Sequence, residues 1–179
     1  MPGDVMRLFF GLKPDPHTCL AIDHWRERTF PPLSRPVPAQ NLHLTLAFLG
    51  EVTERQLEPL LEEAGRIREP PFSLTLDQLG FYSKARVLWI GPIDTPDAAM
   101  RLAADLKRIC RKLSLRSERR KFEAHLTIAR RCETPPPASV EPPSFEMVFD
   151  SFSLFESTNG RTGVQYRAIA EWPLQSQMP

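Results

Sequence analysis

Two short stretches of the sequence place a histidine, a leucine and a threonine in the same order. They are residues 43–45 and 125–127, which lie 82 positions apart. The ordinary pKa of imidazole is about 6.5, so near neutral pH one histidine can accept a proton while another donates one. A phosphodiester is cleaved when one group takes a proton from the nucleophile and another gives a proton to the leaving oxygen. The two motifs therefore have the residue types for that chemistry.

The repetition extends well beyond the two histidines. Sliding the sequence on itself by 82 residues gives eleven identities over the 35 positions from 14 to 48, without a gap. Duplication by itself would preserve core positions without preserving two histidines, so we interpret the pair as functional. We expect one domain, residues 1–179, made of two interleaved lobes. Each lobe contributes one motif, at residues 43–46 and 125–128.

Strand periodicity predicts what the two motifs present to their surroundings. In a strand, residues two apart point to the same face. His43 should therefore share a face with Thr45, and His125 with Thr127, while the leucines point the other way. We expect each lobe to bury its leucine face on its own helices. If the lobes pack about a pseudo-twofold axis, the two polar pairs meet in a cleft between them, where the threonine hydroxyls can donate to phosphate oxygens.

Two residues that follow the motifs are further candidates. Arg130 can neutralise charge on a bound phosphate. Strand parity places it on the leucine face, so it reaches the cleft only if the strand twists or bulges near Ala129. Phe48 has the leucine-face parity too, and we expect it to pack rather than to stack on a base.

The rest of the chain predicts an α+β fold with mostly antiparallel pairing and with the helices outside two sheets. Proline-rich loops at 30–39 and 134–143 should have no regular structure. We place a turn around Gly80, the end of the first histidine strand at Gly50, and a late start or a kink in the second helix because of Pro59. Strands are expected at about 5–12, 42–48, 72–76, 86–90, 122–129, 145–155 and 165–172, and helices at about 14–29, from the cap at 53 onward, and at 96–115.

Composition narrows the class of protein. With 179 residues and 41% hydrophobic content the chain can form a real core. No apolar run approaches the roughly 20 residues of a membrane span and no leader is evident, so we expect a cytoplasmic, monomeric protein without a membrane partner. Three widely spaced cysteines indicate neither disulfides nor a thiolate site. The four histidines are too few and too scattered for a metal site, so we expect no metal and no cofactor.

Charge is distributed unevenly along the chain. Between residues 101 and 121 there are nine basic and two acidic residues, although the whole chain has a net charge of +1. Such a run is typical either of a solvated helix face or of a surface that attracts a polyanion such as RNA.

At these residues the sequence resembles the 2H phosphoesterase superfamily, which is marked by two H-x-[ST]-x motifs in a duplicated bilobal fold. It resembles most the bacterial RNA 2′,3′-cyclic phosphodiesterases, also called 2′-5′ RNA ligases. The stretches "RLFFGL", "NLHLTLAFLGEV", "RVLWIG" and "FEAHLTIAR" follow the family's order over nearly the whole chain. Ala124 departs from the proline that relatives often have before the second histidine.

The resemblance implies metal-independent hydrolysis of an RNA 2′,3′-cyclic phosphate to a 2′-phosphomonoester. It assigns proton donation to the departing 3′ oxygen to His43, and activation of water to His125. Thr45, Thr127 and Arg130 would hold the phosphate. The same pair of histidines would catalyse 2′-5′ joining of RNA ends by microscopic reversibility. The alternatives are a phosphodiesterase for a small cyclic nucleotide, and an RNA-binding module with vestigial histidines.

Overall fold

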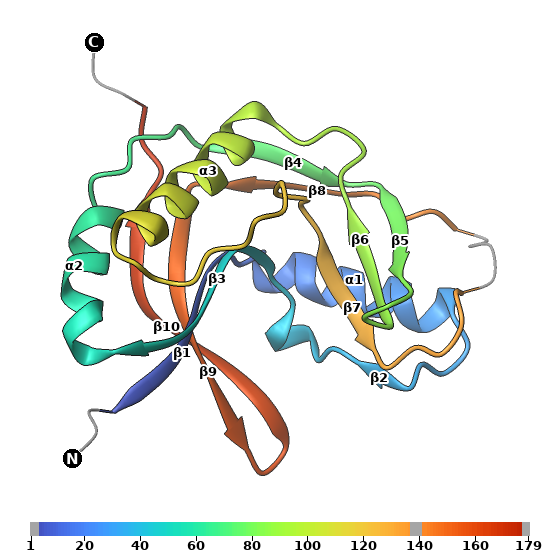
Figure 1. Cartoon of the computed structure of the whole chain (residues 1–179). Coiled ribbons are helices and arrows are strands. Elements are labelled where there is room, and N and C mark those ends of the chain that lie inside the picture. The colour runs from blue at the N-terminus through green and yellow to red at the C-terminus, as the bar shows by residue number, and fades with distance from the viewer. Residues whose placement is uncertain (1–3, 137–140, 177–179) are drawn as a thin grey trace.

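The structure is a computed structural model that describes residues 4–136 and 141–176 (Figure 1). Residues 137–140 of the second proline-rich loop lie outside the described part. The elements in chain order are β1 (Val5–Leu12), α1 (Pro16–Thr29), β2 (Arg35–Pro36), the 3₁₀ turn η1 (Ala39–Asn41), β3 (Leu44–Thr53), α2 (Glu54–Ala64), β4 (Phe72–Leu76), β5 (Gln78–Tyr82), β6 (Val87–Gly91), α3 (Asp97–Lys112), β7 (Leu126–Arg130), β8 (Phe145–Phe149), β9 (Ser151–Gly160) and β10 (Gly163–Pro173).

All strand pairs among the described residues are antiparallel, which confirms the α+β prediction. The main sheet follows the order β10-β9-β1-β3-β7-β6-β5 with β2 beside β7, while β4 and β8 form a separate pair. The half that ends in β3 joins the half that begins with β7 through one residue pair, Leu44 with Leu126. Figure 1 shows β1, β3, β9 and β10 on one side of this join and β5, β6 and β7 on the other.

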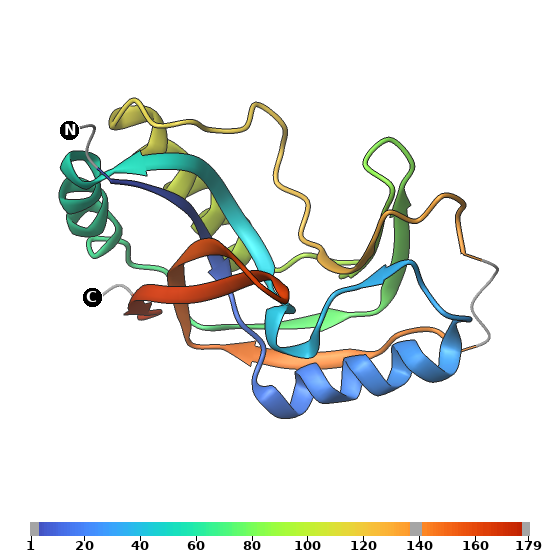
Figure 2. The same cartoon turned by 90° about the horizontal axis from the view of Figure 1, so that it is seen from below.

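Side chains at their N-termini explain where the first two helices begin. The Asp15 carboxylate accepts a hydrogen bond of 2.8 Å from the Thr18 amide and so caps α1. At α2, Thr53 and Gln56 form the reciprocal capping box that the sequence predicts. Pro59 lies inside α2 and does not delay its start. Figure 2 shows α1 along one edge of the molecule and α2 at its far end.

Helices α1 and α3 contact strands of the opposite sequence repeat, whereas α2 contacts β3 of its own repeat. Helix α3, in the second repeat, packs against β3 of the first. In α1, the buried Arg26 donates from Nη1 to the carbonyl of Ile128 in β7 at 2.8 Å and to that of Val37 at 2.7 Å, and it also pairs with Asp23. The expectation that each lobe buries its leucine face on its own helices is therefore wrong for α1 and α3. Periodicity shows which face of a helix is apolar but not which strand that face meets.

Regular structure continues through two places where the sequence predicts that it stops. Within the loop at 30–39, Arg35 and Pro36 pair with the edge of β7, where a proline without an amide is tolerated. Strand β3 runs past Gly50 to Thr53, so the predicted end at Gly50 is wrong. Gly50 adopts a positive φ of 73° next to a bulge at Leu49, and the ladder with β1 resumes beyond it.

The turn expected around Gly80 is also wrong. Gly80 lies in β5 opposite Trp89 of β6, and the chain turns at residues 83–86. A Cβ atom at Gly80 would come within 2.0 Å of Cζ2 of the Trp89 ring. The glycine therefore makes room for an indole ring rather than for a turn.

Two further strand predictions need new boundaries. The expected strand 145–155 divides at Asp150 into β8, which pairs with β4, and β9, which pairs with β1 and β10. The expected strand 122–129 begins only at Leu126. The final hairpin is confirmed as β9 and β10. The three cysteines are buried free thiols, and no helix in the described ranges has the length and apolar character to cross a membrane.

Candidate active site

The two histidines lie at the join between the halves of the main sheet. His43 and His125 each immediately precede the strand that carries the rest of its motif. Counting outward from the Leu44–Leu126 pair of the antiparallel join places His43 across from Thr127 and His125 across from Thr45. Both leucines are fully buried, whereas all four polar residues are partly exposed. The predicted division into a leucine face and a histidine-threonine face agrees with this burial.

The two imidazoles are anchored in the same way. Nδ1 of His43 lies 2.7 Å from the carbonyl oxygen of Asn41, and Nδ1 of His125 lies 2.9 Å from that of Glu123. A carbonyl oxygen can only accept, so both Nδ1 atoms carry the proton and donate it. In the neutral ring, Nε2 is then an acceptor, and that of His43 is 3.1 Å from the Thr45 hydroxyl. Each Nε2 can thus exchange a proton with a substrate.

His43 lies in an aromatic pocket on the β1 side of the join. The ring of Phe9 is 4.8 Å away between centroids, and that of Tyr166 is also 4.8 Å away, edge-on. Burial lowers the pKa of His43 to about 4, the hydrogen bond to the Asn41 carbonyl opposes this shift, and the positive charges of Lys13 and Arg130 add to it. The imidazole is therefore neutral at pH 7 when no substrate is bound.

His125 has a different set of neighbours. The ring of Tyr82 is 5.3 Å from its ring and edge-on, and that of Trp89 is 6.2 Å away. The Tyr82 hydroxyl donates to the Glu123 carboxylate at 3.1 Å, and burial together with this bond raises the pKa of Tyr82 to about 12. Tyr82 thus stays neutral and holds the residue whose backbone carbonyl orients His125. Sequence reasoning missed this role of Tyr82, for which no local pattern gave a signal.

Both motifs are followed by a β-bulge at the same position of the repeat. In the pairing of β1 with β3, Leu46 is the extra residue, and in the pairing of β6 with β7 the extra residue is Ile128. A bulge reverses the alternation of side chains beyond it. Ala129 pairs with the buried Leu88 and is itself fully buried. The next residue must therefore point to the opposite face.

That residue is Arg130, and the bulge directs it to the histidine face. Its side chain is exposed, and its charge contributes to the lowered pKa of His43. Arg130 is expected to reach the histidine face only if the strand twists or bulges near Ala129, and the strand does bulge at Ile128.

The bulge at Leu46 does the same for Phe48, which pairs with Phe9 on the His43 side of the sheet. Phe48 lines a cleft, so the expectation that it packs on the leucine face is wrong. Its ring lies beneath the guanidinium groups of Arg116 and Arg7, at 5.7 Å and 5.9 Å from the centroid.

A cleft of about 1050 Å³ opens from this join. Thr45 and His125 line it, together with Phe48 and Tyr82, and its far wall is formed by α3 and the segment that links α3 to β7. His43, Thr127 and Arg130 are not among its lining residues.

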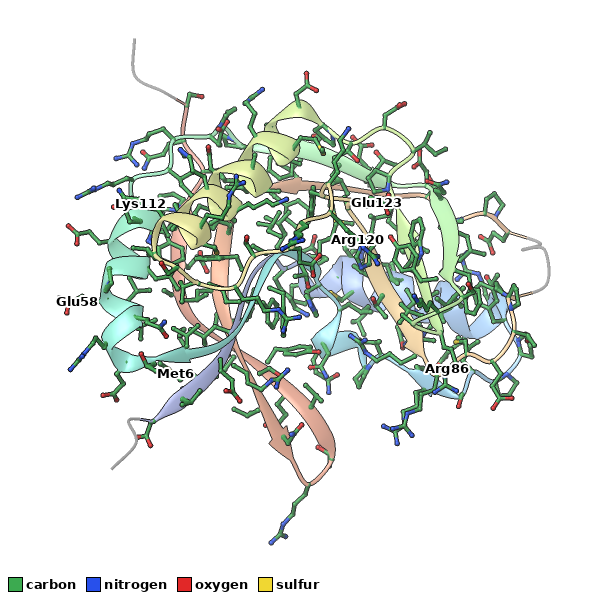
Figure 3. The ribbon with its side chains drawn as sticks, viewed as in Figure 1. Met6, Glu58, Arg86, Lys112, Arg120 and Glu123 are labelled. Carbon is green, nitrogen blue, oxygen red and sulfur yellow. The ribbon has the colours of Figure 1, made fainter. Side chains whose placement is uncertain are left out.

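No three histidine, cysteine or acidic side chains within the described ranges gather as metal ligands would. Figure 3 shows Arg120 and Glu123 on the linking segment, near the middle of the molecule.

The sequence profile of the family described as "LigT like Phosphoesterase" matches the chain twice, over residues 21–89 and 90–166. Each match contains one of the two histidines. The chain belongs to the LigT-like phosphoesterase family. The family that the motifs indicated is thus confirmed.

Individual LigT-like proteins agree with this assignment over most of their length. The chain is 37% identical to the RNA 2′,3′-cyclic phosphodiesterase of Escherichia coli K12, over 96% of this chain and 98% of that protein. It is 32% identical to the protein of that name from Thermotoga maritima, over 75% and 76% of the two chains. A crystal structure of E. coli LigT complexed with 3′-AMP superimposes with a TM-score of 0.89, at 35% identity, and covers 96% of this chain and 99% of that one.

Proposed function

We propose that this LigT-like protein hydrolyses the 2′,3′-cyclic phosphate at the 3′ end of an RNA strand to a 2′-phosphomonoester. The observation that carries the proposal is the paired geometry of His43 and His125. Each donates its Nδ1 proton to a backbone carbonyl and so keeps Nε2 available, on the same face of two adjoining strands. The names of the relatives and the 3′-AMP complex of E. coli LigT support a nucleotide phosphate as the group that binds there.

The reaction requires two proton transfers around one phosphorus atom. Water attacks the phosphorus and gives a proton to the base, the P–O3′ bond breaks, and the acid protonates the departing O3′. The phosphate stays on O2′. We assign the base to His125 and the acid to His43, and we propose that Thr45, Thr127 and Arg130 hold the non-bridging oxygens.

The environment of His43 adds a condition to this assignment. A general acid must be protonated, yet the pKa of His43 is about 4 in the free protein. The negative charge of a cyclic phosphate opposes the effect of Lys13 and Arg130, so substrate binding raises the pKa of His43. His43 then acquires its proton in the complex rather than before it.

We further propose that the chain is one domain of two interleaved lobes with the motifs at 43–46 and 125–128. The double match of the family profile and the exchanged helices support this division. We also propose a monomer that acts in the cytoplasm, where RNA ends are its partners, and that needs no metal ion. Light scattering after gel filtration tests the monomer, and full activity in excess EDTA tests metal independence.

The decisive experiment follows the fate of adenosine 2′,3′-cyclic phosphate by phosphorus NMR. We expect the 2′-monophosphate as the only product. His43→Ala and His125→Ala should each lower kcat by roughly 10²- to 10⁴-fold. His17→Ala, an exposed histidine of α1, is the matched control and should keep full activity. Full activity in either active-site variant would contradict the mechanism.

The same assay separates the other candidate functions. RNA binding without any change at the RNA end would indicate a binding module. A joined 2′-5′ product at high concentrations of RNA would show ligation by the same site. Opening of mononucleotides but not of RNA ends would indicate a small cyclic nucleotide as the substrate.

A further inference from the structure

The cleft is much larger than a cyclic phosphate and one nucleoside require. Its volume of about 1050 Å³ lies at the upper end of the range for pockets that hold a whole drug-sized ligand. A second hollow of about 430 Å³ adjoins it and is lined by Arg7, Gln56 and Ser114 among others. Phe48 and Arg116 line both hollows. The two hollows together therefore form one extended groove that passes Phe48 and leads to His125.

Two sets of cations in this region differ in their surroundings. Away from the groove, three of them neutralise carboxylates: Arg101 pairs with Glu69 at 2.9 Å, and Arg108 with Asp105 and Lys112 with Glu63 at 3.0 Å each. Figure 3 shows Lys112 at the end of α3 beside α2, well separated from Arg120.

The second set faces the groove and is not neutralised in this way. The large cleft is lined by five cationic side chains and by two carboxylates, Glu118 and Glu123. Within residues 4–136 and 141–176 none of these five cations forms a salt bridge, and neither does Arg7. Unpaired cations along a groove are the arrangement that binds a polyanion. The five are Lys84, Lys107, Arg116, Arg120 and Lys121.

The chemistry of the proposed substrate determines what must lie in the groove. A 2′,3′-cyclic phosphate can exist only at the 3′ end of a strand, so every other nucleotide of that RNA lies on its 5′ side. We propose that the groove binds the nucleotides immediately 5′ to the cyclic phosphate, which makes an RNA strand a better substrate than a mononucleotide. This inference rests on the proposed function.

Phe48 and Arg116 have the chemistry for this task. An aromatic ring beside a basic groove is a platform on which a base of any sequence can stack. Arg116 is 5.7 Å above the ring, where it can contact the phosphate next to a stacked base. The groove thus recognises length and charge rather than base sequence.

The test compares two substrates for each protein: adenosine 2′,3′-cyclic phosphate and a tetranucleotide that ends in a 2′,3′-cyclic phosphate. For the unmodified protein we expect kcat/KM to be at least roughly tenfold higher for the tetranucleotide. In Phe48→Leu and Arg116→Gln the ratio of the two values should fall by roughly tenfold, mainly through KM for the tetranucleotide. Arg111→Gln is the matched control, because Arg111 is an exposed arginine of α3 that lines neither hollow.

Salt provides a second readout. The affinity for the tetranucleotide should fall with rising salt, and the slope of log affinity against log salt should be shallower by about 0.7 in Arg116→Gln than in Arg111→Gln. Equal kcat/KM for the two substrates in the unmodified protein would overturn the inference. So would identical behaviour of the two arginine variants.

Failure of the proposed function gives a different result. In that case the unmodified protein opens neither substrate. The groove is then tested by fluorescence anisotropy with a labelled tetranucleotide that ends in a 2′-phosphate. Weaker binding by Arg116→Gln than by Arg111→Gln would support the groove, and equal binding would reject it.

Discussion

Lys13 lies beneath the turn of backbone that orients His43. Its ammonium group donates to the carbonyl oxygens of Gln40 at 2.6 Å and Leu42 at 2.7 Å, which flank Asn41. The carbonyl of Asn41 in turn accepts the Nδ1 proton of His43. The lysine charge also helps to lower the pKa of His43. The position 82 residues later, in the repeat that carries the other histidine, is a threonine.

Replacing Lys13 with methionine should therefore change the acidity of one histidine. We expect Lys13→Met to raise the pKa of His43 above about 4, because a nearby cation is removed. Nitrogen-15 NMR titration of the histidines measures this directly. The looser turn should also lower kcat by roughly tenfold, since the ring loses its fixed orientation. Lys112→Met removes a distant charge and is the control. A His43 pKa that is unchanged by Lys13→Met would refute the coupling.

Stability should depend on the charge state of His43. In the unfolded chain a histidine titrates near 6.5, whereas folded His43 has a pKa of about 4. Between these values the unfolded state binds a proton that the folded state does not, so acid favours unfolding. We expect His43 to account for a loss of about 1 to 2 kcal/mol in the free energy of unfolding between pH 7 and pH 5.

Urea denaturation at both pH values, compared with His43→Gln, measures that contribution. The variant should lose correspondingly less stability on acidification. An identical pH dependence in the two proteins would show that His43 is not held neutral by the fold.

Arg130 and Arg131 offer a comparison between adjacent residues. If the bulge at Ile128 turns Arg130 to the phosphate, Arg130→Gln should lower kcat/KM for a cyclic mononucleotide by roughly 100-fold. Arg130→Lys should recover part of this loss, because charge returns without the planar fork. Arg131 is an exposed neighbour beyond the strand, and Arg131→Gln should have little effect. Equal losses in both glutamine variants would argue for a general charge effect instead.

Gly80 should tolerate no side chain. Gly80→Ala brings a methyl group into the Trp89 ring, and we expect it to lower the free energy of unfolding by about 1 to 3 kcal/mol. Gly65 ends α2 in a helical conformation, and a methyl group added there would make only ordinary contacts, so Gly65→Ala should be nearly neutral. Chemical denaturation measures both. The double variant Gly80→Ala/Trp89→Leu should recover stability if the clash is the cause.

Local patterns predicted those features that local interactions determine. The capping box of Thr53 and Gln56, the final hairpin and the burial of Leu44 and Leu126 follow from spacing alone. The direction of Arg130 does not, because a bulge is a property of two paired strands. In the pairing of β6 with β7, the β7 strand has one extra residue, Ile128, between two successive pairs. No pattern in the residues from His125 to Arg130 indicates this.

Long-range packing likewise determined the features that the sequence could not reveal. From the sequence alone, Gly80 suggests a turn. Its position within a strand is explained only by Trp89, which lies opposite it. The run from Phe145 to Phe155 alternates like one strand, but its two parts meet different partners on either side of Asp150. In the basic segment, too, neutralised cations can be told from groove-lining ones only when the surrounding carboxylates and the groove are placed.

The exchange of helices between the two repeats has a consequence for folding. Helix α3 packs against β3, and Arg26 of α1 is hydrogen bonded to β7. Unfolding of either helix therefore removes packing or hydrogen bonds from a strand of the other repeat. Each repeat thus depends on a helix of the other repeat for its stability. We expect the chain to denature in a single cooperative transition, and a fragment cut between the repeats to regain its structure only by complementation with the other fragment.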